Sequence, residues 1–439
     1  MLNKKFYFIL ALPALFLLVN RFPYLQIISI IFLIILGIIY FVINRNISTY
    51  HYEIITILII IFIYLIFSYF FSGQSLSNFL SYSFLRHDGN FFFCYILFFV
   101  YSIPFFKYQE VLSIYFKFIF TIFTLFSIYG IIEYFLNIQP LMVLKDPYAG
   151  TYFRALNFAH NATGSVYVMA SIFALVFFLK EKNIKLKLIY CFVLLFCAIG
   201  LFLTKSRGGY IGFFIAAVFV LWFNYRSIKK FFISMIFILV PSLAFVFSTG
   251  IYKRILQIFD FKAATAVTRL DLWRKAWFLF SQSPLFGIGF GRYNDISNYD
   301  RLRGITGFFD FYLDPIFINS DAHSHNSYLQ FLTETGLLGL SFLILFWIFC
   351  LIILIRAYNN STNSFAKKAY LSGVGSIIAL FILSLTENYF SATTVMICVS
   401  MVVSMSIGLY WQENSKIIYG LDYNKSPVIN KNTTTNNKF

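Results

Sequence analysis

The chain has 439 residues, of which 60% are hydrophobic and only 12% are charged. An ordinary soluble domain carries about twice that charged fraction, so this class is excluded. The net charge of +17 would suit nucleic acid. Nucleic-acid binding is not expected, however, because the basic residues lie in short loops between apolar runs, where membrane topology signals are found. The composition therefore predicts a polytopic membrane protein that contacts the lipid bilayer.

The hydropathy pattern predicts an all-α fold, a bundle of about twelve transmembrane helices. An apolar run of about 18 or more residues can cross a hydrocarbon layer roughly 30 Å thick as a helix. The expected spans are 6–19, 25–43, 54–71, 89–105, 110–136, 161–179, 187–203, 209–223, 231–249, 328–356, 369–388 and 392–411. The first resembles a signal peptide but has no A-x-A cleavage site after it, so an uncleaved span is expected. Residues 1–413 would form one membrane domain and 414–439 a polar cytoplasmic tail.

The connecting loops give an orientation. Alternate loops carry most of the lysines and arginines, among them the K-E-K-N-I-K-L-K run from Lys180 and the pair Lys367 and Lys368. By the positive-inside rule this set is cytoplasmic, and so are both termini. The other set then faces outward, and it contains one long segment, 250–326, between the ninth and tenth spans. Connections this long inside a compact domain are usually functional.

Part of this outer segment has the pattern of an amphipathic helix. In R-L-D-L-W-R-K-A-W-F-L-F, from Arg269 to Phe280, the apolar side chains recur at helical spacing. Those expected on one face are Leu272, Trp273, Ala276, Trp277 and Phe280. Tryptophans are enriched at headgroup depth, so the pattern predicts a helix that lies in the membrane interface.

Histidine and arginine meet at the predicted outer face. His323 and His325 end the long outer segment, and Arg207 and Arg269 lie in an outer turn and in the same long segment. The planar guanidinium of arginine can donate two hydrogen bonds to a phosphate, and it stays charged at any relevant pH. Histidine suits proton transfer near neutrality. This combination predicts a site for a phosphate leaving group and a hydroxyl nucleophile.

Two acidic residues bear on the alternative of a transporter. Glu133 and Glu387 fall near the outer ends of their predicted spans, and ionisable groups in spans are functional candidates. A transporter would need such groups near the midplane of the membrane. Their position on the same side as the arginines favours an enzyme, and a transporter stays the alternative from a different class.

No metal or cofactor is expected. The five cysteines lie inside apolar runs without C-x-x-C spacing, which predicts neither a disulfide framework nor a thiolate metal site. No carboxylate cluster or histidine pair has convincing metal-ligand spacing in the sequence. A chelator should accordingly have no direct effect on the purified protein.

Three motifs resemble those of one known superfamily. The pattern H-N-x9-G-x-x-G is met by His325, Asn326, Gly336 and Gly339. S-R-G-G occurs at 206–209, and R-x-x-x-W, from Arg269 to Trp273, precedes S-P-L-F-G-I-G-F-G. In combination these motifs resemble the O-antigen ligase and O-antigen polymerase superfamily, most strongly over 154–387. The two glycines are expected to be close-packing positions, as small residues are in membrane helices.

The resemblance implies a metal-independent glycosyl transfer at the periplasmic face of the bacterial inner membrane. The donor would be a glycan on undecaprenyl pyrophosphate, and for a ligase the acceptor would be a sugar hydroxyl of lipid A core. A single displacement would invert the anomeric centre. The ligase is the favoured member, and a polymerase that joins lipid-linked repeat units is the alternative.

The resemblance also implies roles for particular residues. His325 takes the place of the essential histidine, proposed to deprotonate or orient the acceptor, and Arg207 and Arg269 take the places of arginines proposed to hold the pyrophosphate. Arg154, in F-R-A-L-N-F-A-H-N, resembles an upstream arginine motif that usually continues toward P-N, where this chain has His160 and Asn161. Possible supporting residues are His323, Arg274, Asn326 and Glu387. His323 is expected to matter less than His325, because two residues apart on a helix they would not share a face.

Overall fold

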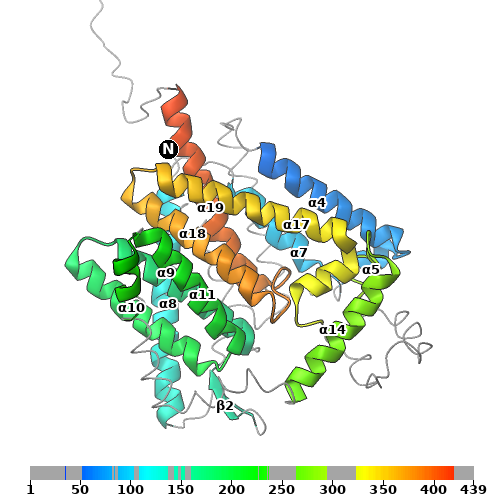
Figure 1. The fold of residues 1–439 in the computed structure, drawn as a ribbon, viewed down its shortest axis with the longest axis horizontal. Coiled ribbons are helices and arrows are strands. Elements are labelled where there is room, and N and C mark those ends of the chain that lie inside the picture. Colours follow the sequence, from blue (N-terminus) through cyan, green and yellow to red (C-terminus); the bar gives the residue numbers. More distant parts are fainter. Residues whose placement is uncertain are drawn as a thin grey trace, which may run out of the picture.

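The computed structural model describes residues 35, 52–81, 84, 88–102, 108–136, 143–146, 150–153, 160–225, 227–234, 236, 264–293 and 323–419. These residues are predominantly helical, as predicted (Figure 1). The first half holds α4 (Tyr52–Phe71), α5 (Leu76–Phe79), α7 (Asn90–Ser102), α8 (Tyr108–Leu136) and the antiparallel strands β1 (Val143–Asp146) and β2 (Gly150–Phe153). The second holds α9 (His160–Lys180), α10 (Ile184–Leu203), α11 (Arg207–Tyr225), α14 (Ala264–Gln282), α17 (Ser327–Asn360), α18 (Ser364–Leu383) and α19 (Thr393–Tyr419).

Eight of the described helices are long and apolar enough to cross a membrane, namely α4, α8, α9, α10, α11, α17, α18 and α19. The chain is therefore a multi-pass membrane protein, but the count of twelve spans is not confirmed. The predicted span 6–19, all of 25–43 except residue 35, and most of 231–249 lie outside the described residues. The span predicted at 89–105 coincides with α7, which has 13 residues.

The helices α9, α18 and α19 form the centre of the bundle. Most of the apolar stretch of α9 and of α19 is buried inside the bundle, and α9 packs on α10, α11 and α18. Small residues permit this close packing: a methyl group on Gly375 of α18 would lie 2.6 Å from Ile172 of α9. By contrast α4 and α10 present apolar side chains outward, among them Ile63, Phe71, Leu188 and Leu195.

The two ends of the bundle differ in chemistry. At one end, Lys368 near the start of α18 forms an ion pair with Glu181 just after α9, with 2.6 Å between Nζ and Oε2. At the opposite ends of these same helices, Asn161 of α9 lies beside Glu387, in the loop that follows α18. The loop just after α9 and the start of α18 therefore lie at the end of the bundle opposite the loop that carries Glu387.

The long helix α17 is broken at Gly336, which has φ 65° and ψ −170°. The backbone of the glycine-rich segment 284–289 fills the break (Figure 1 shows the bend in α17). The amides of Ile288 and Gly289 donate to the Thr333 and Glu334 carbonyls, which a continuous helix would pair with residues 337 and 338. In turn, the amides of 337 and 338 donate to the carbonyls of 284 and 285. Each backbone group freed by the break thus regains a partner.

The side chain of Glu334 holds the residues that follow this glycine-rich segment. Its buried carboxyl group accepts hydrogen bonds from the amides of Gly291, at 3.1 Å, and Tyr293, at 3.3 Å. The Gln330 side-chain amide donates a third, at 2.6 Å. The glycine motifs are therefore structural positions, as expected: a methyl on Gly336 would lie 2.3 Å from the Leu285 carbonyl oxygen.

Two expectations drawn from the sequence need correction. The span predicted at 369–388 is α18, which runs from Ser364 to Leu383, so Glu387 lies in the following loop and not in a helix. The apolar face predicted for the interfacial helix is divided in α14: Leu272 and Ala276 are buried, and α14 packs against α17. Of the two tryptophans on that face, Trp277 is exposed and Trp273 is half-buried.

We predict that Gly336→Ala destabilises the protein strongly. The φ and ψ of this residue are essentially restricted to glycine, which costs any other residue about 1–3 kcal/mol, and the added methyl would also meet backbone that cannot move aside. Gly73→Ala is the matched control, since Gly73 has φ 85° but no atom within 4 Å of the added methyl. Thermal unfolding of the purified variants in detergent should show a larger fall in Tm for Gly336→Ala. Equal falls would mean that the close backbone contact is unimportant.

Candidate active site

The loop that carries His325 is held in a sharp turn before α17. Asn326 is the N-cap of α17, and its side chain accepts hydrogen bonds from the amides of Tyr328 and Leu329. His325 itself has φ 49°, in the left-handed region that residues other than glycine seldom adopt. Ser324, which is fully buried, donates from its hydroxyl to the Asn326 carbonyl at 2.7 Å. The predicted histidine is therefore on a fixed turn and not on a helix.

The loop between α18 and α19 carries Glu387 and is tied to the start of α17. The amide of Ser327 donates to the Ser384 carbonyl at 2.8 Å, and the Ser327 hydroxyl donates to the Glu387 carbonyl at 2.8 Å. The same hydroxyl oxygen accepts from the Tyr389 amide at 2.7 Å. One buried serine thus fixes the backbone on either side of Glu387 relative to His325.

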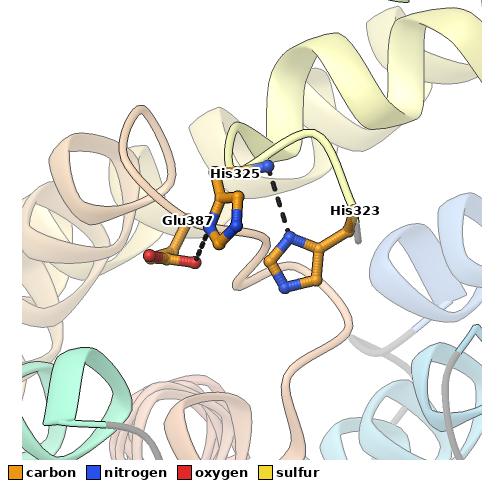
Figure 2. Close-up of side chains that lie close together, drawn as sticks. All are labelled: His323, His325 and Glu387. Carbon is orange, nitrogen blue, oxygen red and sulfur yellow. Dashed lines mark hydrogen bonds and ion pairs between the residues drawn. The ribbon is translucent and has the colours of Figure 1, made fainter. Parts of the chain in front are cut away.

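The Glu387 carboxylate joins three segments of the chain. Its Oε2 lies 2.7 Å from Nδ1 of His325, and its Oε1 lies 3.0 Å from a guanidinium nitrogen of Arg269 on α14. The side-chain amide of Asn161, in the first turn of α9, donates to Oε1 at 2.7 Å. Figure 2 shows the histidine ring directed at this carboxylate. The structure therefore brings together two of the predicted residues, His325 and Arg269, on one predicted supporting residue.

The electrostatics of Glu387 follow from these contacts. Burial raises the pKa of the carboxyl, but the hydrogen bond from His325 and the charges of His325, His323 and Arg269 outweigh it. The net result is a pKa below its ordinary value of 4.5. Glu387 is thus an anion at neutral pH, although it is only 8% exposed.

An ionised Glu387 determines which nitrogen of His325 carries the proton. A carboxylate can only accept hydrogen bonds, so Nδ1 of His325 must donate. In the neutral imidazole the other nitrogen, Nε2, then has the lone pair. The His325 side chain is 32% exposed, so Nε2 can meet a substrate. This arrangement fixes the tautomer of His325 and gives its Nε2 the lone pair that a general base requires.

His323 lies closer to His325 than the sequence suggested. The two ring centroids are 4.5 Å apart, and Nδ1 of His323 accepts a hydrogen bond from the His325 backbone amide at 3.3 Å (Figure 2). The two histidines were expected to lie on a helix and to face different directions, but α17 begins only at Ser327. In the turn before it, the two side chains share one side.

The other predicted arginines differ in their placement. Arg207 is the first residue of α11, and the next residue, Gly208, packs so closely that a methyl on it would lie 2.2 Å from the Thr386 hydroxyl. The start of α11 is therefore beside the Glu387 loop. Arg274 lies five residues after Arg269 on α14, about 140° around the helix, so it faces another direction. Arg154 lies outside the described residues.

His323, His325 and Glu387 also form the kind of cluster that can hold a metal ion. Within the described part of the chain their ligand atoms all lie within 4.8 Å of one another. The sequence spacing could not reveal this set, because Glu387 is 62 residues from His325. A divalent cation would, however, face the Arg269 guanidinium across the same carboxylate, and it would compete with the Glu387 hydrogen bond to Nδ1. The contacts fit an ion-pair network better than a metal centre.

The fold and the site together define a class: a multi-pass membrane protein with a histidine, a carboxylate and an arginine in contact at one end of its helix bundle. Residues 191–344 match a family model described as O-antigen ligase. This match covers 154 of the 439 residues and supports the resemblance of the chain to the O-antigen ligase superfamily. No curated protein matches the chain. The matched residues include Arg207, Arg269 and His325, whereas Glu387 and Asn161 lie beyond them.

Three residues of the site were not selected from the sequence. Asn161 was noted only as a departure from the family pattern, yet its amide contacts Glu387. Trp273 was part of a motif without a role, and its indole N–H donates to the Ser324 carbonyl at 3.0 Å. Ser327 carried no signal beyond its place after Asn326. A polar residue at the start of an apolar run, on the same side as His325, is the signal that would have found Asn161.

We predict that the stability contributed by Glu387 depends on pH. Its pKa is lower in the folded than in the unfolded protein, so the unfolded state binds more protons between the two values. The stabilisation is therefore present above the ordinary value of 4.5 and is lost as the pH falls below it. The difference in Tm between the wild type and Glu387→Gln should be full at pH 7 and should shrink as the pH falls below 4.5. A difference that stays constant through this fall would show that the charge of Glu387 does not stabilise the fold.

Proposed function

We propose that this protein is a glycosyltransferase of the O-antigen ligase type. In this proposal it transfers a glycan from undecaprenyl pyrophosphate to a sugar hydroxyl of lipid A core, without a metal or other cofactor. The reaction takes place at the periplasmic face of the bacterial inner membrane, with both termini in the cytoplasm. The observation that carries the proposal is the contact of His325 and Arg269 with one buried carboxylate, Glu387.

The chemistry that this site supports is a single displacement. The acceptor hydroxyl oxygen attacks the anomeric carbon and gives its proton to Nε2 of His325. The bond between the anomeric carbon and the phosphate oxygen breaks, and the pyrophosphate leaves with the electron pair. Glu387 stabilises the imidazolium that forms, as a carboxylate does for the histidine of a catalytic triad. Attack opposite to the leaving group inverts the anomeric centre.

The arginines would stabilise the pyrophosphate. Arg269 uses one guanidinium nitrogen for Glu387, and a guanidinium has five N–H donors, so it can contact a phosphate as well. Arg207 is proposed to act from the start of α11, beside the same loop. A role for Arg154 rests on the resemblance of its motif alone. Pyrophosphate is a good leaving group, so charge stabilisation suffices and no acid is required.

The polymerase reaction uses the same donor and the same chemistry, and it differs only in the acceptor. We favour the ligase because the matching family model is described as O-antigen ligase. A transporter is less well supported. The backbone groups at the break in α17 are paired with the segment 284–289, and Glu334 beside it accepts three hydrogen bonds, so neither is left free to coordinate a substrate or ion.

The decisive experiment replaces His325 with alanine. The purified variant should transfer no glycan but should still bind the lipid-linked donor, because the arginines remain. Glycan transfer is measured with and without EDTA, and the chelator should not change the transfer rate of the wild type or of His325→Ala. Normal transfer by His325→Ala would reject the assignment of the base. Loss of wild-type transfer in EDTA, restored by a divalent cation, would instead support the metal cluster.

A gene deletion separates the ligase from the polymerase. For a ligase, lipid A core should lack all long glycan, and the lipid-linked polymer should accumulate. For a polymerase, lipid A core should carry a single repeat unit. Normal surface glycan in the deletion strain would contradict both assignments.

We also predict that Arg269→Lys lowers the transfer rate by on the order of 10²-fold, the typical effect of removing one donor that stabilises developing charge. Lysine keeps the positive charge but cannot contact the carboxylate and a phosphate with one planar group. The measurement is kcat and the donor KM of the purified variant. Arg274→Lys is the matched control on the same helix and should stay close to the wild type. Full activity of Arg269→Lys would reduce Arg269 to a structural partner of Glu387.

A further inference from the structure

We propose that Trp273 is a positioning residue that sets the orientation of His325 through the backbone of Ser324. The inference rests on the proposed function of His325 and adds a residue to which no role has been assigned. Trp273 contacts neither the imidazole nor the carboxylate in the described contacts. It acts on the peptide that precedes the histidine.

Ser324 is held by several hydrogen bonds. The indole N–H of Trp273 donates to the Ser324 carbonyl at 3.0 Å, and the Ser324 amide donates to Oε1 of Gln330 at 3.0 Å. Its hydroxyl donates to the Asn326 carbonyl and accepts from the Asn326 amide at 3.3 Å. The carbonyl of Ser324 belongs to the peptide that joins it to His325. The carbonyl end of that peptide is therefore held from α14, and its N–H end donates to Nδ1 of His323 at 3.3 Å.

His325 needs such support because its backbone conformation is sparsely populated. A histidine with φ 49° keeps this conformation only where the surroundings impose it. On the side-chain end, one hydrogen bond to Glu387 fixes the ring. At the backbone, the peptide between Ser324 and His325 determines the direction in which the His325 side chain leaves the chain. Without the indole contact, the bond from the His325 amide to His323 would be the remaining described hydrogen bond of this peptide, and a rotation of the peptide would carry Nε2 away from the acceptor.

The placement of Trp273 couples the base to the arginine. Arg269 and Trp273 are four residues apart on α14 and so lie on one face of the helix. Arg269 contacts Glu387, which holds the imidazole, and Trp273 contacts the backbone beneath it. One turn of α14 thereby sets the distance between Arg269, which is proposed to bind the pyrophosphate, and His325, the proposed base.

A purely structural role for the indole N–H is less well supported, because α14 is already docked by other contacts. The Thr333 hydroxyl of α17 donates to the Ala276 carbonyl at 3.0 Å. The Tyr293 hydroxyl donates to the Leu272 carbonyl at 2.7 Å. Leu272 and Ala276 are also fully buried. Loss of the single contact from Trp273 should therefore leave α14 in place.

The test is Trp273→Phe, which removes the N–H donor and keeps an aromatic ring. We expect kcat for glycan transfer to fall roughly ten- to a hundredfold, as expected for a small misplacement of a reacting group, while the donor KM stays within about twofold. Trp277→Phe is the matched control, since Trp277 lies one turn further along α14 and is 56% exposed. It should match the wild type. A second readout is the rate at which diethylpyrocarbonate modifies His325, followed by mass spectrometry, which should change in Trp273→Phe alone.

Each contrary outcome is distinct. Wild-type kcat and wild-type modification in Trp273→Phe would overturn the proposal, and so would equal losses in both tryptophan variants. A rise in donor KM together with a large fall in Tm would also overturn it, since general damage to α14 would then explain the loss. If His325→Ala is inactive but Trp273→Phe is normal, only the role of Trp273 fails. If His325→Ala is active, the proposed function itself fails.

Discussion

The site depends on one buried carboxylate. Glu387 accepts hydrogen bonds from His325, Arg269 and Asn161, which come from three different parts of the chain. A buried anion is tolerated only when it is paired and hydrogen-bonded, and these three partners meet that requirement. The relation is mutual. Without the carboxylate, Arg269 would lose its negative partner, and His325 would lose the group that fixes its tautomer. The contacts that compensate the charge of Glu387 therefore also fix the position of the proposed base, His325.

The position of this carboxylate depends in turn on an irregular stretch of backbone. Glu387 could contact His325 only if the start of α17 and the loop after α18 were fixed against each other, which Ser327 achieves. The first part of α17 is short because of the break at Gly336. The glycine-rich segment supplies hydrogen bonds to the backbone groups at the break. These glycines thus support the histidine indirectly, by permitting backbone to pack on backbone.

The sequence predicted the helical class and most of the described spans, because these follow from hydropathy. His325 and Arg269 were found because each belongs to a short motif. Glu387 was found only as a supporting residue and was placed inside a span, since the apolar run of 369–388 gives no sign that α18 ends at Leu383. The contact of Asn161 with Glu387 joins residues 226 positions apart, and no local pattern encodes such a pairing. The proximity of His323 was missed because a helical face was assumed where the chain turns.

The separation of these contacts along the chain has a consequence for biosynthesis. A ribosome adds residues from the N-terminus, so α9, α14 and the histidine turn are all made before Glu387, which follows the last but one of the described helices. Until α18 has been inserted and its loop has returned to the start of α17, the histidine and the arginine have no carboxylate between them. A partly synthesised chain would thus hold the residues of the matched segment 191–344 without the carboxylate that orients the imidazole. In this order of events, the histidine of an unfinished protein would lack its fixed tautomer.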